Sequence, residues 1–138
     1  MIKISMVPVE HIEHIWPAVE YYVEEALKYF PGRYTTEDIK KGLLNEPRQL
    51  WIAFEDDIVY GVVGTHVITY PQMKTLFMHF IGGDRGLEWK DAMLKMLQHF
   101  AKNNSCSLLE AQGRNGWKKI FKNNGLNSHT ICFDIPVE

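Results

Sequence analysis

The sharpest change of hydrophobic period in the chain falls between Lys74 and Lys102. Residues 74–81 form an apolar and aromatic run that is typical of a buried strand. Glycines interrupt the run within 82–86, where the chain can turn sharply. Beyond this turn the apolar positions recur at helical spacing, at Trp89, Met93, Met96, Leu97 and Phe100. The pattern predicts a strand, a glycine-rich turn and a helix, in that order.

The same two periods predict the other elements. Before the central unit they predict a strand at 2–7, helices at 12–30 and 35–46, and strands at 49–54 and 58–70. After it they predict a strand at 107–111, a short helix at 117–122 and a last strand at 129–135. Pro17 is expected to kink the first helix or to mark its first turn. Thr35, with acidic residues after it, is expected to cap the second helix.

This order of elements predicts an α/β fold with one mixed sheet and helices on both faces. We expect six to seven strands in a single domain over 1–138, since no repeat or linker divides the chain. The strands at 74–81 and 107–111 are expected to be parallel neighbours. A helix joins them, and such connections are nearly always right-handed crossovers within one sheet.

Composition narrows the function classes. The chain is 46% apolar and 23% charged, as ordinary soluble globular proteins are. No apolar run approaches the roughly 18 residues of a membrane span, so no membrane partner is expected. Two cysteines, Cys106 and Cys132, are too few for a disulfide framework and predict reduced thiols in a cytoplasmic protein.

Charge is divided unevenly along the chain. Residues 1–60 hold 6 Lys+Arg against 11 Asp+Glu, a net charge of −5, and residues 61–138 hold 9 against 6, a net charge of +3. The mild asymmetry favours an anionic ligand on the C-terminal half and makes nucleic-acid binding unlikely. One basic cluster has no acid interleaved, and it suits a phosphate, an acidic protein or nucleic-acid backbone, or a solvated helix face: Arg114, Lys118, Lys119 and Lys122.

The strand–turn–helix unit also offers a binding site for an anion. Free backbone N–H groups at the N-terminus of a helix attract phosphate. A short turn of this kind needs glycine for backbone reasons alone, so both interpretations stay open. His11 and His14 are spaced to share a metal, but no third ligand is near them in sequence, so no metal site is expected. No nucleophilic triad, zinc spacing or Walker-type loop is visible.

Several segments carry a resemblance to a known family. The element order, the unit at 74–102 and the segment 117–126 together resemble the GNAT superfamily of acyl-CoA N-acyltransferases. The segments 32–35, 49–51 and 113–117, and Gly82-Gly83 followed by Trp89, are similar to GNAT-like proteins encoded by bacteriophages. The resemblance spans nearly the whole chain and implies acetyl-CoA as cosubstrate, with a small-molecule or protein amine as acceptor.

The resemblance also implies which residues hold the cosubstrate. It places the thioester carbonyl against the strand ending at Ile81 and the phosphates at the following turn. The expected cosubstrate-binding residues are Ile81, Gly82, Gly83, Arg85, Gly86, Lys90 and Arg114. The family's pyrophosphate loop reads Arg/Gln-x-x-Gly-x-Gly/Ala, but from Arg85 this chain has Glu88 and Lys90 where glycine and glycine/alanine are usual. The loop is therefore degenerate, and Phe121 stands where the family often has a tyrosine acid.

Glu110 and His79 are the candidate catalytic residues. Glu110 would act as a base on the strand beside the one at 74–81, and a partner role towards Arg114 is the structural alternative. His79 would shuttle protons if it is not a plain core or surface histidine, and it is expected to point away from Met78 and Phe80. His66 shares that alternative, and Tyr34 is expected to line an acceptor pocket; Trp51 and Trp117 are expected in the core.

Two hypotheses follow. The first is an N-acetyltransferase-like protein that uses acetyl-CoA through a degenerate phosphate loop. The second is a GNAT-fold protein without catalysis, a phage virion, assembly or protein-binding component whose partners would be phage structural proteins. If the chain is phage-encoded, it would work in the host cytoplasm or in the virion.

Overall fold

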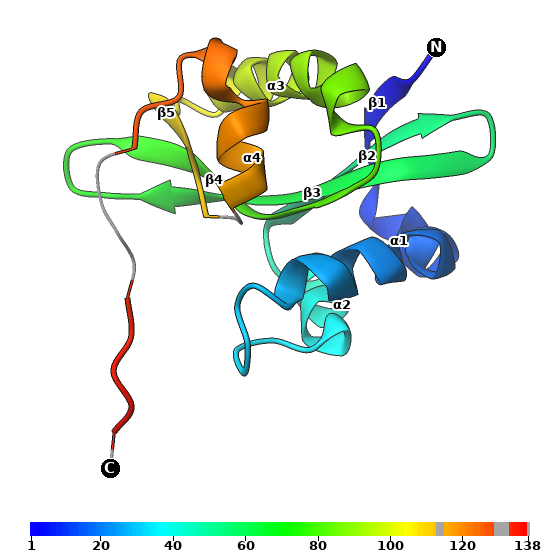
Figure 1. Cartoon of the computed structure of the whole chain (residues 1–138), viewed down its shortest axis with the longest axis horizontal. Helices are drawn as coiled ribbons and strands as arrows, with labels where there is room; N and C mark the ends of the chain where they lie inside the picture. The colour runs from blue at the N-terminus through cyan, green and yellow to red at the C-terminus, as the bar shows by residue number, and fades with distance from the viewer. Residues whose placement is uncertain (113–114, 129–132, 138) are drawn as a thin grey trace.

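The structure, a computed structural model, describes residues 1–112, 115–128 and 133–137. Its strands are β1 (Lys3–Met6), β2 (Arg48–Glu55), β3 (Ile58–Thr69), β4 (Lys74–Gly83) and β5 (Leu108–Ala111). Its helices are α1 (Ile12–Leu27), α2 (Thr36–Asn45), α3 (Gly86–Asn103) and α4 (Asn115–Ile120), with short 3-10 turns η1 (Val9–His11) and η2 (Lys122–Asn124). The strands form one mixed sheet in the order β1-β2-β3-β4-β5 (Figure 1).

The pairing of β4 with β5 confirms the central prediction from the sequence. These two strands are parallel neighbours, and α3 is the helix that connects them. The other neighbouring pairs are antiparallel. Because α3 begins three residues after β4 ends, its first turn lies beside the C-terminal end of that strand.

The predicted number of strands was too high. The described residues form five strands, not six or seven. The missing one is the strand predicted at 129–135, of which 129–132 lie outside the described residues and 133–135 form no strand. Phe133 and Ile135 are 80% and 77% exposed, so the alternation that suggested a strand has no sheet or core to face.

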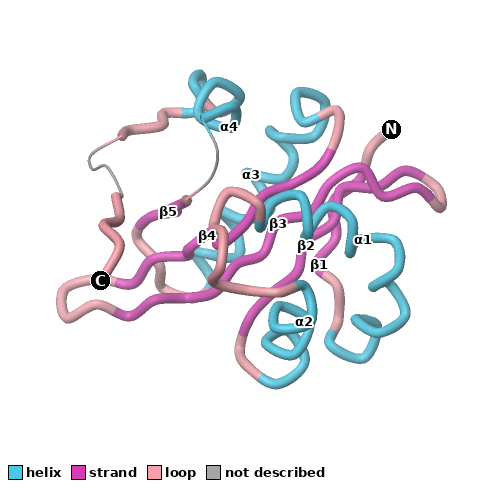
Figure 2. Tube along the Cα trace, turned by 60° about the horizontal axis from the view of Figure 1, so that its bottom comes forward, coloured by secondary structure: helices cyan, strands magenta, loops and turns pink. Residues whose placement is uncertain are grey.

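Helices cover both faces of the sheet, as predicted. Helices α1 and α2 pack on one face, and α3 and α4 pack on the other (Figures 1 and 2). The core under α1 and α2 includes Ile12, Val19, Val23, Leu43, Leu50, Val62 and Phe80. The core under α3 and α4 includes Trp51, Leu76, Met78, Ile81, Trp89, Met93, Leu97, Trp117 and Phe121. The expectation that Trp51 and Trp117 are core residues is confirmed.

Local signals explain where α1 and α2 begin. Thr35 caps α2 in a capping box: its hydroxyl accepts from the Asp38 N–H, and the Asp38 carboxylate accepts from the Thr35 N–H. Pro17 lies inside α1, five residues past its start, so it does not mark the first turn of that helix. Of the helices in the described part of the chain, none is both long and apolar enough to span a bilayer.

Candidate active site

Strand β4 extends beyond the end of β5 and leaves an edge of the sheet without a described partner strand. Their parallel pairing extends from Thr75 opposite Leu108 to Met78 opposite Ala111, and β4 then continues to Gly83. The last backbone contact between the two segments is Gln112 N–H to Met78 C=O, at 3.5 Å. Within the described residues no strand pairs with this edge of β4 beyond that point. An extended polar group could therefore bind to the backbone of β4 here.

A β-bulge lies at the start of this open edge. In the pairing of β3 with β4, Gly64 is opposite Phe80 but Thr65 is opposite Met78, so His79 is the extra residue. The sequence alternation predicted that His79 points away from both neighbours. This is right for Met78 and wrong for Phe80, because the bulge turns His79 and Phe80 to the same face, where both line the hollow under α2.

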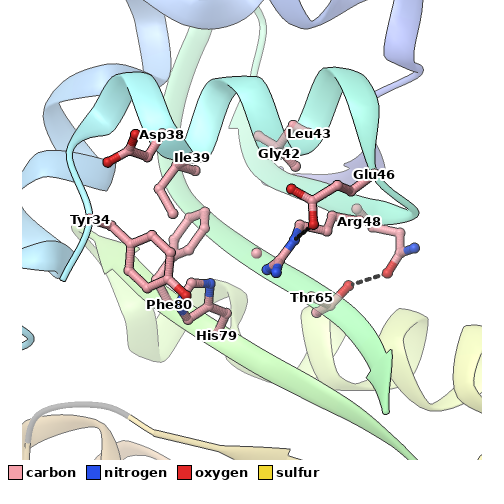
Figure 3. Close-up of a pocket in the computed structure, with 12 residues that line it drawn as sticks. Tyr34, Asp38, Ile39, Gly42, Leu43, Glu46, Arg48, Thr65, His79 and Phe80 are labelled. Atoms are coloured by element: carbon pink, nitrogen blue, oxygen red, sulfur yellow. Dashed lines mark hydrogen bonds and ion pairs between the residues drawn. The ribbon is translucent and has the colours of Figure 1, made fainter. Parts of the chain in front are cut away.

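That hollow is the candidate acceptor site (Figure 3). It lies between α2 and the strands β2, β3 and β4, with the loop before α2 at one end. Its volume is about 360 Å³, open solvent included. It is lined by Tyr34, Asp38, Ile39, Gly42, Leu43, Glu46, Arg48, Gln49, Gly64, Thr65, His79 and Phe80. The expectation that Tyr34 lines a pocket thus fits this placement.

Arg48 and His79 line the hollow, and His66 lies beside both of them. Arg48 Nη1 lies 3.3 Å from His66 Nδ1, and the rings of His66 and His79 have centroids 6.0 Å apart. Tyr34 stacks edge-on against His79 at 4.8 Å between centroids. The side chains converge from β2, β3, β4 and the loop before α2, so the sheet and α2 together set their positions.

Burial and charge keep both imidazoles neutral. Burial, helped by the nearby Arg48 and His66, lowers the pKa of His79 to about 4. Burial and Arg48 likewise lower the pKa of His66. At neutral pH the His79 ring therefore has a nitrogen lone pair, which a proton acceptor requires.

Glu110 lies on the same face of the sheet as His79. It is directly opposite Phe77 in the parallel ladder, and the rings of Phe77 and His79 have centroids 6.2 Å apart. Glu110 Oε1 is buried and has no hydrogen-bond partner among the described residues. The two predicted catalytic residues are therefore brought together on one face, diagonally across β4 and β5.

The predicted phosphate ligands are placed differently. Arg85 is the N-cap of α3, with φ +57°, and its guanidinium makes two bonds to Glu88, Nε–Oε2 at 2.5 Å and Nη2–Oε1 at 2.6 Å. This pairing raises the pKa of Arg85 and lowers that of Glu88. Lys90 donates to Asn124 Oδ1 at 2.8 Å and lies 3.3 Å from Asp91. Both cations near the first turn of α3 are thus already paired within the chain.

The remaining predicted ligands lie along the end of β4 and beyond. Ile81 is buried in the core under α3, and Gly86 is the first residue of that helix. A Cβ at Gly82 would lie 2.6 Å from the backbone oxygen of Tyr22, so this glycine lets α1 approach the sheet. Gly83 has φ +139°, which favours glycine. These two glycines have packing and backbone reasons of their own; Arg114 lies outside the described residues.

Other chemistry gains no support from the geometry. Phe121 is buried against Trp117, and Lys118 and Lys119 are exposed on α4. His11 and His14 lie at the start of α1. Among the described residues no group of three or more His, Cys, Asp or Glu side chains is placed to hold a metal ion.

Arg48 is the site residue that sequence analysis missed. It is opposite His66 in the antiparallel ladder between β2 and β3, which brings together residues 18 positions apart. Alternation shows which residues of one strand share a face but not which residues of two strands are opposite. The Arg85–Glu88 pair, by contrast, had a signal in the sequence, since residues three apart in a helical turn are neighbours.

No protein-family model and no curated protein matches the sequence, but solved structures match the fold. A ribosomal-protein-alanine N-acetyltransferase from Brucella melitensis biovar Abortus 2308 is 16% identical, with a TM-score of 0.75 over 99% of this chain and 100% of that one. A predicted acetyltransferase with acetyl-CoA from Clostridium acetobutylicum is 14% identical, with a TM-score of 0.70 over 99% and 96%.

An aminoglycoside acetyltransferase from an uncultured soil metagenomic sample, in complex with sisomicin, also matches. It is 10% identical, with a TM-score of 0.72 over 99% of this chain and 97% of that one. At such identities the likeness concerns the fold, and it extends over the whole length of both chains. The order of the elements, the parallel β4–β5 pair and these neighbours together show that the chain has the GNAT acetyltransferase fold.

Proposed function

We propose that this protein is an acyl-CoA-dependent N-acyltransferase, with acetyl-CoA as cosubstrate and an amine as acceptor. The observation that carries the proposal is the separation of β4 from β5 beside His79. It leaves an open strand edge on β4, with a neutral imidazole on β4 and a buried carboxylate oxygen on β5 on the same face of the sheet. The neighbouring structures support an acetyltransferase-like role, and some of them contain acetyl-CoA or CoA.

The residues of the open edge fit the cosubstrate in part. Backbone groups of β4 beyond Met78 suit an extended amide chain, and the first turn of α3 suits phosphate. Arg85 and Lys90 would add charge there only after leaving Glu88 and Asn124. The cosubstrate supplies an activated thioester carbonyl, and this chain supplies its placement.

Glu110 and His79 would receive the proton of the acceptor. A neutral amine in the hollow attacks the carbonyl carbon, the new C–N bond forms and the C–S bond breaks. As the bond forms, the nitrogen becomes strongly acidic, so even an imidazole with a pKa of about 4 or a carboxylate can accept its proton. The departing thiolate takes a proton from water, because Phe121 offers none. Turnover should therefore rise with pH as the amine becomes neutral.

The acceptor is proposed to be a small-molecule amine. Aminoglycosides are the ligands or substrates of several neighbours, and the hollow under α2 is where such an amine would enter. The test is thiol release from acetyl-CoA with a panel of amines that includes aminoglycosides, polyamines and peptides. Acetyl-CoA titrated into the protein by calorimetry tests the cosubstrate separately.

A second candidate is favoured by the paired cations at α3. Because Arg85 and Lys90 are already neutralised, the chain is also suited to be a GNAT-fold binding component without catalysis. A phage origin and phage structural partners for such a component rest on the sequence resemblance alone. In that case acetyl-CoA would leave the melting temperature unchanged at concentrations where a true ligand must raise it.

A further inference from the structure

We propose that Arg48 and His66 are positioning residues for His79: Arg48 fixes the His66 imidazole and keeps the histidine pair uncharged, so that His79 stays ready to accept a proton. This inference deepens the proposed function and rests on it for its catalytic meaning. The control of the charge of two imidazoles by one arginine is supported separately, by the contacts of these side chains under α2.

The contact between Arg48 and His66 fixes the tautomer of the imidazole. A guanidinium has only donors, so His66 Nδ1, 3.3 Å from Arg48 Nη1, must be the acceptor. The proton of the neutral ring is therefore on Nε2. Protonation of Nδ1 would break this hydrogen bond and place two positive charges in contact, so the geometry itself opposes a charged His66.

Helix α2 holds Arg48 in this position. Glu46, the C-cap of α2, accepts from Arg48 Nε at 3.4 Å. A Cβ added at Gly42 would lie 3.3 Å from the Glu46 carboxylate and 3.4 Å from Arg48 Cδ. The helix thus packs directly on the arginine stem, and the guanidinium is turned towards His66. Only 26% of the Arg48 side chain is exposed.

The influence of Arg48 reaches His79 through space and through His66. The two rings are nearly perpendicular, with an interplanar angle of 88°, and Arg48 adds to the effect of burial in lowering the pKa of both. The charged or titratable groups that line the hollow with His79 are Arg48 from β2, Asp38 from α2, Glu46 at the C-cap of α2 and Tyr34 from the preceding loop, and Glu110 lies on the same face from β5. Arg48 is the cation of this set, and Glu46 opposes its effect on the pKa of His66.

A titration of the imidazole protons by NMR tests this directly. It would use the wild type, Arg48→Lys, which keeps the charge, Arg48→Gln, which keeps a donor, and Arg48→Met, which keeps neither. Lys95→Gln on α3, across the sheet, is the matched control for loss of a positive charge. We expect Arg48→Met and Arg48→Gln to raise the pKa of His66 and His79 by about one unit, and Arg48→Lys and the control to change neither.

Activity against pH provides the second readout. If the wild type transfers an acyl group, a His79 pKa raised from about 4 by about one unit should give Arg48→Met about threefold lower kcat than the wild type at pH 4.5 and an equal kcat at pH 7, and Arg48→Lys should restore the wild-type profile. Unchanged histidine pKa values in Arg48→Met and Arg48→Gln would overturn the inference, as would a wild-type pH profile in an active Arg48→Met enzyme. A wild type without transferase activity would refute the proposed function instead, and the NMR titration would still decide the role of Arg48.

Discussion

The hollow under α2 and the first turn of α3 treat their charged groups in opposite ways. The neutral His79 imidazole in the hollow has a nitrogen lone pair, and Glu110, on the same face of the sheet, has a buried carboxylate oxygen without a described partner. At α3, the cations expected to bind phosphate are already paired with Glu88 and with Asn124 and Asp91. The polar groups at the hollow therefore remain available to a ligand, whereas the cations at the first turn of α3 already have partners within the chain.

The difference shows where binding energy must come from. A ligand in the hollow meets groups that gain hydrogen bonds, whereas a phosphate at α3 must displace existing ones. Exchanging one charge-assisted bond for another yields a small net free energy, so we expect weak binding of the phosphates and a larger share of binding from the strand edge of β4.

Loss of the Glu110 carboxylate should have the largest effect. Glu110→Gln removes a proton acceptor while preserving the shape of the side chain, and we expect kcat to fall by about 10²–10⁴-fold. The control is Glu10→Gln, an exposed carboxylate at the N-terminal side of α1. A turnover that is equal in Glu110→Gln and the control would remove Glu110 from the mechanism. The melting temperature of Glu110→Gln should equal that of the wild type, because Oε1 loses no described hydrogen bond.

The buried imidazole should make the fold sensitive to acid. The folded pKa of His79 is about 4, below its ordinary value of 6.5, so between these values the unfolded chain binds the proton and the folded one does not. Stability should therefore fall as pH drops from 6.5 to 4, by on the order of 1–3 kcal/mol after allowance for solvent screening. Urea unfolding of the wild type and His79→Gln at both pH values measures it. Equal pH dependence in the two proteins would contradict the burial of His79.

Release of a paired cation should strengthen cosubstrate binding. Glu88→Gln removes the partner of Arg85 and a like charge near the phosphates, and we expect acetyl-CoA to bind about five- to tenfold more tightly. Calorimetric titration measures the change, with Glu10→Gln as control for the loss of one negative charge. Unchanged affinity would mean that the phosphates lie away from the first turn of α3.

Substitutions at the start of α2, the helix that covers the hollow, should have the smallest effects. Thr35→Ala removes the N-cap of α2 and should lower the free energy of unfolding by about 1 kcal/mol. Thr36→Ala, one position further, is the control because Thr36 is not the cap. If the cap also holds Tyr34 over His79, the Michaelis constant for the amine should rise in the first variant only. Identical unfolding curves for both variants would contradict the capping box.

Much of the fold could be predicted because its signals are local. The start of α2 follows from Thr35 and Asp38, and the parallel β4–β5 pair follows from a strand, a turn and an amphipathic helix in sequence. Alternation does not show what a strand pairs with: the strand predicted at 129–135 lies partly outside the described residues, and its described positions 133–135 form no strand. Phe133 and Ile135 have the alternation but remain exposed.

The site was harder to predict because it depends on register. His79 and Glu110 were chosen for their chemistry, and the fold brings them to one face. Alternation places His79 on the face opposite Met78, and the bulge then brings Phe80 to the same face as His79. Alternation assumes a regular ladder, so it does not predict such an extra residue. Arg48 reaches His66 through the ladder between β2 and β3, and no short segment contains both.

The order of strands in the sheet has a consequence for how the protein is made. Neighbouring strands are consecutive in the chain, so β1 to β4 can pair before α3 and β5 have left the ribosome. All residues that line the hollow lie within 34–80, whereas Glu110 and the helices that cover the opposite face follow. We expect the part of the chain that forms the hollow to fold first during synthesis. The apolar face of the sheet that α3 later covers should stay exposed until the remaining residues emerge from the ribosome.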